Sequence, residues 1–401
     1  MGLLSVDDAL ARILAKAHVL EAEHVALTAL PGRVLAANIA ARLTQPPFDA
    51  SAMDGYAART ADVAALPATL TLIGEAAAGH AFPGTVGAGE TVRIFTGAPV
   101  PQGADAIVIQ ENTQADGKNV RVVDGTPDHA HIRPRGGDFR QGQTVLTRGH
   151  RLTARDILLV AATGHAGADC TRRPKVAILA TGDELVQPGE MPRPDQIVSS
   201  NPYGLAAMLS AFGAESVLLG IARDTLDSLG EKLAAAADAD IVITIGGASV
   251  GDHDLVVPAL EAAGMTLDFW KIAMRPGKPM IFGHRDRQII LGVPGNPVSS
   301  MICARVFAVP LVMAMLGMPA EAAQPVGATL DAPLEANGPR THYMRAHHTR
   351  QGSGIEGVRP ITNQDSSLIA PLAMADCLII RPPGAPALPA GATVDTLPLD
   401  F

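Results

Sequence analysis

Apolar runs of strand length alternate with amphipathic stretches of helical length through the second half of this chain. The strand-like runs span 176–180, 217–221, 240–245 and 288–293, and the helical stretches span 202–212, 224–237, 254–263 and 301–316. Strands that alternate with helices favour a mostly parallel sheet with both faces covered. Because ligands bind such sheets at the carboxyl ends of the strands, we expect a site at that edge.

The first half of the chain has a different pattern. Ser5 and Thr153 each precede apolar residues at helical spacing and are predicted N-caps, and Gly164 is predicted to end the second helix. Between these helices, short strand-like pieces are separated by glycine and proline, which is typical of a small β-rich unit. The pieces span 69–73, 90–95, 106–110 and 120–123.

These changes of pattern predict an α/β multidomain protein, because 401 residues exceed what one hydrophobic core normally supports. Residues 1–46 and 134–172 are predicted to form a linker domain, and residues 47–133 a β-rich domain inserted into it. Residues 173–319 are predicted to form the parallel α/β domain, and residues 320–401 a small C-terminal β domain.

Composition narrows the class of protein. A formal net charge of −9 argues against a surface that coats nucleic acid or an anionic membrane. Asp7 and Asp8 stand where a leader would be basic, and no apolar run is expected to reach the length of a membrane span, so a soluble cytoplasmic protein is predicted. Cys170, Cys303 and Cys377 lie far apart, which fits small buried thiols in a reducing compartment.

Two glycine-containing turns follow predicted strands. Residues 294–300, Pro-Gly-Asn-Pro-Val-Ser-Ser, join a strand to a helix; Gly295 allows close backbone approach, Asn296 can cap and Pro297 suits a first helical turn. Residues 246–251, Gly-Gly-Ala-Ser-Val-Gly, lead into two further acids, Asp252 and Asp254. Amides at such turns bind phosphate and carboxylates bind divalent metals, so a phosphorylated substrate and a metal are predicted.

Residues 46–57, Pro-Pro-Phe-Asp-Ala-Ser-Ala-Met-Asp-Gly-Tyr-Ala, closely resemble the signature of the molybdopterin molybdenumtransferase family, which includes MoeA and the E domain of gephyrin. The similarity continues through 93–101, 135–138, 181–185, 246–251, 271–279 and 294–299. The resemblance implies the last step of molybdenum cofactor assembly, in which molybdate is inserted into adenylylated molybdopterin and AMP is released by hydrolysis with Mg²⁺. The resemblance also implies that residues 173–319 form the molybdopterin-binding domain. It also implies a homodimer with transient contact to the molybdopterin adenylyltransferase.

The resemblance also assigns residues to the site. Positions with catalytic roles in the family match Asp54, Asp138, Glu184, Asp224, Asp254, Lys271 and Arg275, of which Glu184, Asp224 and Asp254 are the implied metal ligands. Cofactor-binding positions match Thr96, Gly246, Gly247, Ser249, Gly251, Lys278, Pro294, Gly295, Asn296, Pro297, Ser299, Arg345 and Ser366. Asp54 and Asp138 are expected to complete the site across a subunit boundary.

Several of these residues also have ordinary structural readings. Asp54 precedes Gly55 and by composition is a turn residue, and Asp224 fits an N-cap as well as a ligand. The basic segment 271–279 is either a solvated loop or part of an oxyanion pocket, and its Arg275 stands where many relatives carry lysine. His253 is expected to be a spectator. His342, His347 and His348 are expected to be surface histidines, because no cysteine or acid accompanies them at metal-binding spacing.

Two other functions stay open on the sequence. The α/β domain alone also resembles the molybdopterin adenylyltransferases, although residues 46–57 and the β tail argue against that activity. A non-catalytic molybdopterin-binding scaffold is the second alternative, although the acidic positions of the site are intact.

Overall fold

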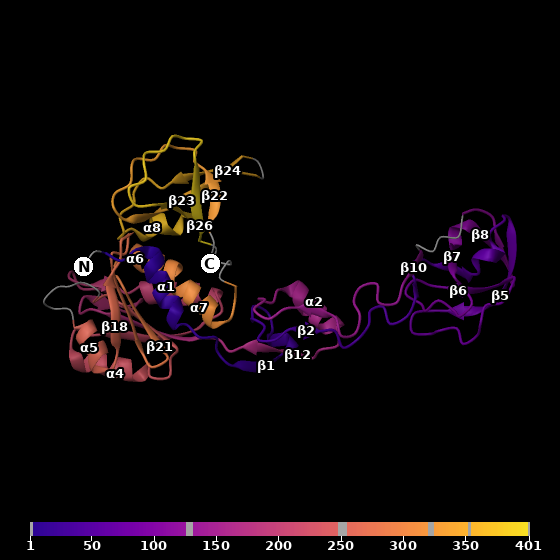
Figure 1. Cartoon of the computed structure of the whole chain (residues 1–401), viewed down its shortest axis with the longest axis horizontal. Helices are drawn as coiled ribbons and strands as arrows, with labels where there is room; N and C mark the ends of the chain where they lie inside the picture. The colour runs from indigo at the N-terminus through magenta and orange to yellow at the C-terminus, as the bar shows by residue number, and fades with distance from the viewer. Residues whose placement is uncertain (1–2, 126–130, 248–254, 320–324, 352–353, 400–401) are drawn as a thin grey trace.

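The computed structural model describes residues 3–125, 131–247, 255–319, 325–351 and 354–399. The protein is elongated (Figure 1): the α/β domain and the C-terminal β domain lie at one end, a small linker module lies in the middle, and a β-rich module lies at the far end. The predicted α/β class and the small C-terminal β domain are confirmed. The residue limits of the domains stay a prediction.

A six-stranded sheet with the order β16-β13-β17-β21-β20-β18 forms the α/β domain. Its strands are β13 (Lys175–Thr181), β16 (Glu215–Ala222), β17 (Ile241–Ile245), β18 (Thr266–Lys271), β20 (Pro279–Arg285) and β21 (Gln288–Val293). The first four strands of this order are parallel, as predicted, whereas β20 pairs antiparallel with both β21 and β18. The apolar pattern predicts neither β20 nor β18, and β18 buries only Phe269.

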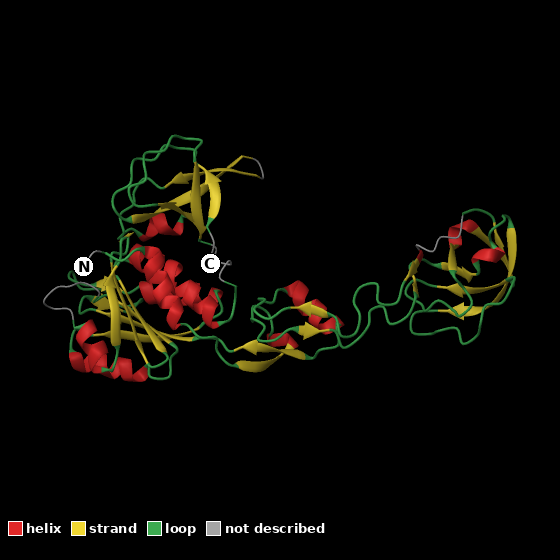
Figure 2. Ribbon diagram, viewed as in Figure 1, coloured by secondary structure: helices red, strands yellow, loops and turns green. Residues whose placement is uncertain are grey.

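Helices cover both faces of this sheet (Figure 2). One face carries α3 (Asn201–Ala211), α6 (Pro297–Cys303), the π-helical turn η5 (Ala304–Ala308) and α7 (Val309–Met315), and the other carries α4 (Leu226–Ala235) and α5 (Val256–Ala262). Along β13, Ile178 points into the first core and Leu179 into the second, which is the alternation expected of a strand. Helix α1 (Val6–Lys16), capped by Ser5 as predicted, packs against α7.

Helices α6, η5 and α7 form one continuous helix, Pro297–Met315. It has 19 residues and a mean hydropathy of 1.9, so the expectation that no apolar run reaches membrane-spanning length is wrong. Of this stretch, 83% is buried inside the protein, and Arg305 within it donates from Nε to the carbonyl of Pro398 at 3.0 Å. A helix that is apolar on all sides is expected when other elements surround it.

The linker module joins two parts of the chain that lie far apart in sequence. β1 (Ala22–Ala26) pairs with β12 (Gly167–Thr171), and β2 (Ile39–Ala40) pairs with β11 (Thr144–Leu146), both antiparallel. η1 (Leu27–Ala29) packs against α2 (Ala154–Ala162). As predicted, α2 begins at Thr153, which forms a capping box with Asp156, and is followed by Gly164 with φ of +88°.

The β-rich module begins and ends at the pair β3 (Ala50–Ser51) and β10 (Ile132–Arg133). Its sheet has the order β7-β4-β6-β5-β9-β8. The elements are β4 (Gly55–Ala58), η2 (Thr60–Asp62), β5 (Ala68–Ala76), β6 (Glu90–Ile94), β7 (Ala106–Ile109), η3 (Gln110–Asn112), β8 (Thr113–Asp116) and β9 (Asn119–Val122). The four predicted strands correspond to β5, β6, β7 and β9.

The C-terminal module is a sheet with the order β19-β23-β25-β26-β22, and β24 pairs with β23. Its elements are β19 (Met274–Arg275), β22 (Val326–Thr329), β23 (Thr341–Gln351), β24 (Gly354–Pro360), α8 (Ile369–Ala373), β25 (Cys377–Arg381) and β26 (Thr393–Pro398). β19 comes from the basic segment between β18 and β20 and pairs in parallel with β23. The basic segment is therefore not a free loop, because it joins the α/β and C-terminal modules.

Candidate functional site

A cavity of about 860 Å³ opens at the carboxyl ends of the parallel strands, the edge where a site is expected. It is lined by residues that follow β13, β16, β17 and β21, and by Ser367 and Ile369 of the C-terminal module. Eight of the predicted site residues line this cleft: Glu184, Asp224, Gly246, Gly247, Pro294, Gly295, Asn296 and Pro297.

Two carboxylates stand on one side of the cleft. Glu184 follows β13 and precedes the short pair β14 (Leu185–Val186) and β15 (Ile197–Val198), and Asp224 follows β16. Arg223 donates to the carbonyls of Asp183 at 3.1 Å and Leu185 at 3.3 Å, which ties the ends of β13 and β16 together. Within the described parts of the chain, neither the Glu184 nor the Asp224 carboxylate has a hydrogen-bond or ion-pair partner.

Asp224 is not an N-cap, which removes its ordinary structural role. Helix α4 is capped instead by Thr225, whose hydroxyl accepts from the amide of Ser228 at 3.2 Å. Only the backbone amide of Asp224 is engaged, donating to Asp183 Oδ1 at 3.4 Å. An exposed acid with a free carboxylate at the end of a parallel strand is available to a ligand.

The two glycine turns lie against each other. Gly246 has φ of +94°, and a Cβ atom there would lie 2.9 Å from both the carbonyl oxygen and Oγ1 of Thr181. A Cβ atom on Gly295 would lie 3.7 Å from the Cα of Gly246. Glycine at position 246 is therefore required both by its backbone conformation and by the close approach of β13.

The turn 294–296 is fixed through its carbonyl groups. Asn201 Nδ2 donates to the carbonyl of Gly295 at 2.7 Å, and the Ser300 hydroxyl donates to the carbonyls of Pro294 and Asn296. In contrast, the backbone amides of Gly247, Gly295 and Asn296 find no acceptor among the described residues. Three unpaired donors at the edge of a cleft, beside the start of a helix, suit an oxyanion.

Asn296 and Ser200 occupy N-cap positions, but neither side chain caps its helix. Asn296 Nδ2 instead donates to Ser366 Oγ at 3.2 Å, and the Val298 amide donates to the Ser366 carbonyl at 3.1 Å. The predicted cap role of Asn296 is therefore replaced by a contact to the C-terminal module. Ser299 lies buried within α6.

Arg345 holds the segment that carries Ser366. Its side chain is 1% exposed, and its guanidinium donates to the carbonyls of Asn363, Asp365 and Leu368 at 2.9–3.0 Å. Arg345 does not line the cleft. Its hydrogen bonds indicate that Arg345 positions residues 363–368, which include Ser367 of the cleft wall.

None of the three predicted cations, Lys271, Arg275 and Lys278, is among the lining residues of the cleft. Lys271 Nζ lies 3.9 Å from the ring centroid of Trp270, and Lys278 is exposed next to Pro279, which does line the cleft. Arg275 lines a different cavity of about 730 Å³, together with Asp331 and Glu335. Among the described lining residues of the cleft there is no lysine or arginine.

Asp54, Thr96 and Asp138 lie away from the cleft in this chain. Asp54 accepts from both the amide and the hydroxyl of Thr96 at 2.7 Å, and these hydrogen bonds lower the pKa of its carboxyl group. The amide of Asp138 donates to the carbonyl of Gln45 at 3.1 Å, close to where the β-rich module joins the linker. Figure 1 shows β6, β7 and β10 at the opposite end of the molecule from β21. A single chain therefore does not bring these residues to its own cleft.

Some predictions lie outside the described residues, and others are corrected. Ser249, Gly251, Asp254 and His253 are outside the described residues. His342 is not a surface residue: it is buried, and burial together with Arg275, Arg340 and Arg381 lowers its pKa to about 4. All three cysteines are buried free thiols, as predicted.

Sequence reasoning does not name Arg223 and Ser367 as site residues, and it does not predict the contacts that Asn201 and Ser300 make. Asn201 stands directly before the predicted helical stretch 202–212, and its partner Gly295 is 94 residues away. A polar residue before a helix gives no signal of so distant a partner, so only the folded arrangement identifies its role.

Models of known families match most of the chain. Residues 4–164 match the MoeA N-terminal region (domain I and II), residues 177–314 match a probable molybdopterin binding domain, and residues 327–399 match the MoeA C-terminal region (domain IV).

Individual relatives agree with these matches. The chain is 35% identical to a molybdopterin molybdenumtransferase of Nostoc sp., covering 94% of this chain and 89% of that protein. It is 33% identical to a molybdopterin molybdenumtransferase of Haemophilus influenzae, covering 95% of this chain and 94% of that protein. Among solved structures, the molybdopterin biosynthesis MoeA protein of Pyrococcus horikoshii matches with a TM-score of 0.85 at 27% identity, covering all of both chains.

Proposed function

This chain belongs to the molybdopterin molybdenumtransferase family, and we propose that its α/β cleft is the place where adenylylated molybdopterin binds and receives molybdenum. The protein is a transferase that inserts molybdenum in molybdenum cofactor biosynthesis. One observation carries the proposal for the site: unpaired amides on two touching glycine turns face the same cleft as two unpaired carboxylates.

The free amides suit the pyrophosphate of the substrate. An adenylylated pterin carries negative charge on its phosphates, and the amides of Gly247, Gly295 and Asn296 offer donors without competition from protein acceptors. Because Asn201 and Ser300 hold the carbonyls of residues 294–296, the amides of Gly295 and Asn296 are fixed before the substrate arrives. Preorganised dipoles of this kind stabilise charge that develops during phosphoanhydride cleavage.

The carboxylates suit Mg²⁺. Glu184 and Asp224 would hold the ion, since Mg²⁺ takes oxygen ligands and is usually bound by one or two carboxylates together with substrate phosphates. Both acids line the cleft, and the other ligands of the ion would come from substrate and water. The bound ion would neutralise charge on the phosphate oxygens. Asp254 remains a predicted ligand.

A homodimer would place Asp54, Thr96 and Asp138 at the cleft of a partner chain. Support for this part of the proposal comes from the elongated shape, which separates the β-rich module from the cleft of its own chain. Lys271 and Lys278, which adjoin the cleft-lining Pro279, would act on molybdate or on phosphate from the margin of the cleft, whereas Arg275 lines a different cavity. The proposal also includes a cytoplasmic location. It further includes transient contact with the adenylyltransferase that makes the substrate.

The proposal is tested by AMP release from purified protein supplied with adenylylated molybdopterin, molybdate and Mg²⁺. We expect release to require both molybdate and Mg²⁺, and Glu184→Gln or Asp224→Asn to slow it by at least ~100-fold, the usual effect of removing one electrostatic stabiliser. Asp227→Asn, an exposed acid in the first turn of α4, is the matched control and should change nothing.

Two outcomes would favour other functions. Formation of the adenylylated pterin from ATP and molybdopterin would indicate an adenylyltransferase. Tight substrate binding without molybdate-dependent AMP release would indicate a binding scaffold.

A further inference from the structure

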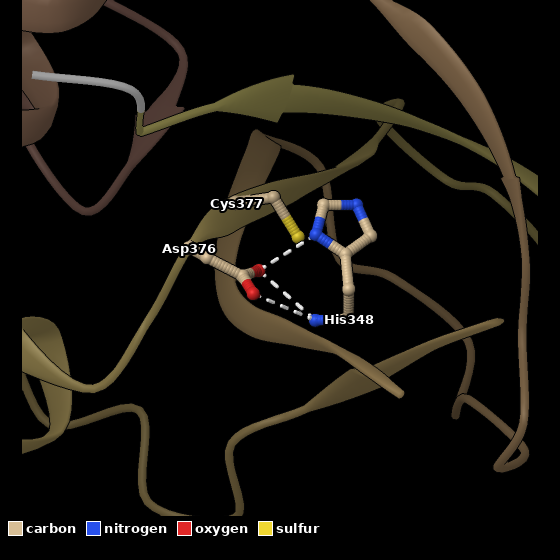
Figure 3. Close-up of side chains that lie close together, drawn as sticks. All are labelled: His348, Asp376 and Cys377. Carbon is tan, nitrogen blue, oxygen red and sulfur yellow. Dashed lines mark hydrogen bonds and ion pairs between the residues drawn. The ribbon is translucent and has the colours of Figure 1, made fainter. Parts of the chain in front are cut away.

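Three side chains with metal-ligand chemistry meet in the C-terminal module, outside the cleft (Figure 3). One ligand atom each of His348, Asp376 and Cys377 lies within 4.8 Å of the other two. No other three histidine, cysteine, aspartate or glutamate side chains converge in this way within the described residues. Sequence spacing does not reveal this group, because Asp376 lies 28 residues beyond His348 and Cys377 follows it as the first residue of β25.

The strand pairing explains why these residues meet. Cys377 at the start of β25 pairs with Ala346 on β23, and His348 lies two residues beyond Ala346 on the same face of that strand. The Asp376 amide donates to the Ala346 carbonyl at 3.1 Å, and the Asp376 carboxylate accepts from the His348 amide at 2.9 and 3.1 Å. Backbone hydrogen bonds thus hold the three side chains together.

We propose that His348, Asp376 and Cys377 form a binding site for a divalent cation of the Zn²⁺ type. One imidazole nitrogen, one carboxylate oxygen and one thiolate sulfur are ligands that Zn²⁺ accepts, whereas Mg²⁺ takes oxygen ligands. Three protein ligands leave a fourth position for water or for a further ligand. That position faces solvent, because the side chains of Asp376 and His348 are 45% and 19% exposed while Cys377 is buried beneath them.

The same atoms form an ordinary ion pair beside a thiol when no cation is bound. His348 Nδ1 lies 2.9 Å from Asp376 Oδ1. Ligand atoms around a tetrahedral ion with bonds of about 2.1–2.3 Å lie roughly 3.4–3.8 Å apart, so this pair would open by about 0.5 Å on binding. Binding of the cation to the sulfur as a thiolate would release the Cys377 proton to solvent.

Co²⁺ is the probe that distinguishes this site from the proposed Mg²⁺ site, because only a cysteine ligand gives a thiolate-to-cobalt charge-transfer band. We expect the full-length protein, freed of metal by a chelator, to bind one Co²⁺ per chain with such a band, and Zn²⁺ to displace it. Cys377→Ser should abolish the band. Cys170→Ser, which alters another fully buried cysteine in the linker module, is the matched control and should retain it.

His348→Ala is a second test that keeps all three cysteines and does not depend on Cys377→Ser folding. It should weaken Co²⁺ binding by at least ~10-fold, measured by titration of the same band. Absence of a charge-transfer band in the unaltered protein, or a band that survives in both variants, would overturn the proposal. Neither result would bear on AMP release, so the proposal for this cation site and the proposal for the cleft are tested independently.

Discussion

At the scale of single residues, Gly246 decides how closely the two turns of the cleft approach each other. We expect Gly246→Ala to lower the free energy of unfolding by at least about 1 kcal/mol, because its φ of +94° disfavours a side chain and Cβ would meet Thr181 at 2.9 Å. The displaced turn should also weaken binding of adenylylated molybdopterin. Chemical denaturation and calorimetry measure the two effects.

The control for that substitution is Gly230→Ala. Gly230 lies inside α4 with no heavy atom within 4 Å of an added Cβ, so alanine should raise stability by up to about 1 kcal/mol through helix propensity. Equal effects of the two substitutions would contradict the role given to Gly246.

His342 gives the protein a pH-dependent term in its stability. Its pKa is depressed to about 4 from an ordinary 6.5. Between these pH values the unfolded chain binds a proton that the folded chain does not, so the contribution is fully present above pH 6.5 and is lost as pH falls toward 4. The slope attributable to this group approaches about 1.4 kcal/mol per pH unit.

Urea unfolding between these pH values measures that slope. His342→Gln should flatten the profile, whereas His80→Gln, which alters an exposed histidine, should not. An unchanged profile in His342→Gln would show that the histidine is accessible to protons in the folded state.

Site residues could be predicted from the sequence where they lie close to the end of a predicted strand. Gly246, Gly295, Glu184 and Asp224 follow strands directly, and all four line the cleft. Asn201 and Arg345 could not be assigned their contacts, because the carbonyls they bind are brought near only by folding.

At the scale of elements, Arg345 connects the C-terminal sheet to the cleft through residues 363–368. The planar guanidinium of Arg345 donates to three carbonyls at once, and the single ammonium group of lysine cannot reproduce this geometry. Arg345→Lys should therefore lower the free energy of unfolding by at least about 2 kcal/mol. Substrate affinity should fall as well, because Ser366 and Ser367 lose their support.

Arg359→Lys is the control for this element. Arg359 is 54% exposed and pairs with Asp331 at 3.1 Å, so the same substitution there should change stability by no more than about 1 kcal/mol. Thermal unfolding of both variants tests the comparison, and similar destabilisation would remove the positioning role of Arg345.

Elements with a regular apolar pattern were predicted correctly, and those without one were missed. β13, β16, β17 and β21 are runs of strand length between helices. β18 and β20 flank a basic segment whose charges suggest a loop, and its strand β19 is stabilised by pairing with β23 from another module. The helix Pro297–Met315 has the composition of a membrane span, and only its burial shows that it is a core helix.

At the scale of the whole molecule, the separation of Asp54 from the cleft requires a second chain if both act in one site. A mixture of Asp54→Ala and Glu184→Gln chains should then regain activity that neither has alone. With random pairing, half of the dimers are mixed and each has one intact site, so about a quarter of the unaltered activity is expected. No recovery after unfolding and refolding the mixture would exclude a shared site.

The elongated shape was not predictable from the hydrophobic pattern. Local periodicity identifies the modules, but their spacing depends on the pairs β1–β12, β2–β11 and β3–β10, which join residues from both sides of the insertion. Such pairs are too short to leave a signal in the sequence.

The most direct measurement is a crystal structure of the protein soaked with adenylylated molybdopterin, molybdate and Mg²⁺. The account predicts pyrophosphate oxygens within hydrogen-bonding distance of the amides of Gly247, Gly295 and Asn296, with the ion on Glu184 and Asp224. Substrate bound instead in the cavity lined by Arg275, Asp331 and Glu335, with the cleft empty, would contradict it.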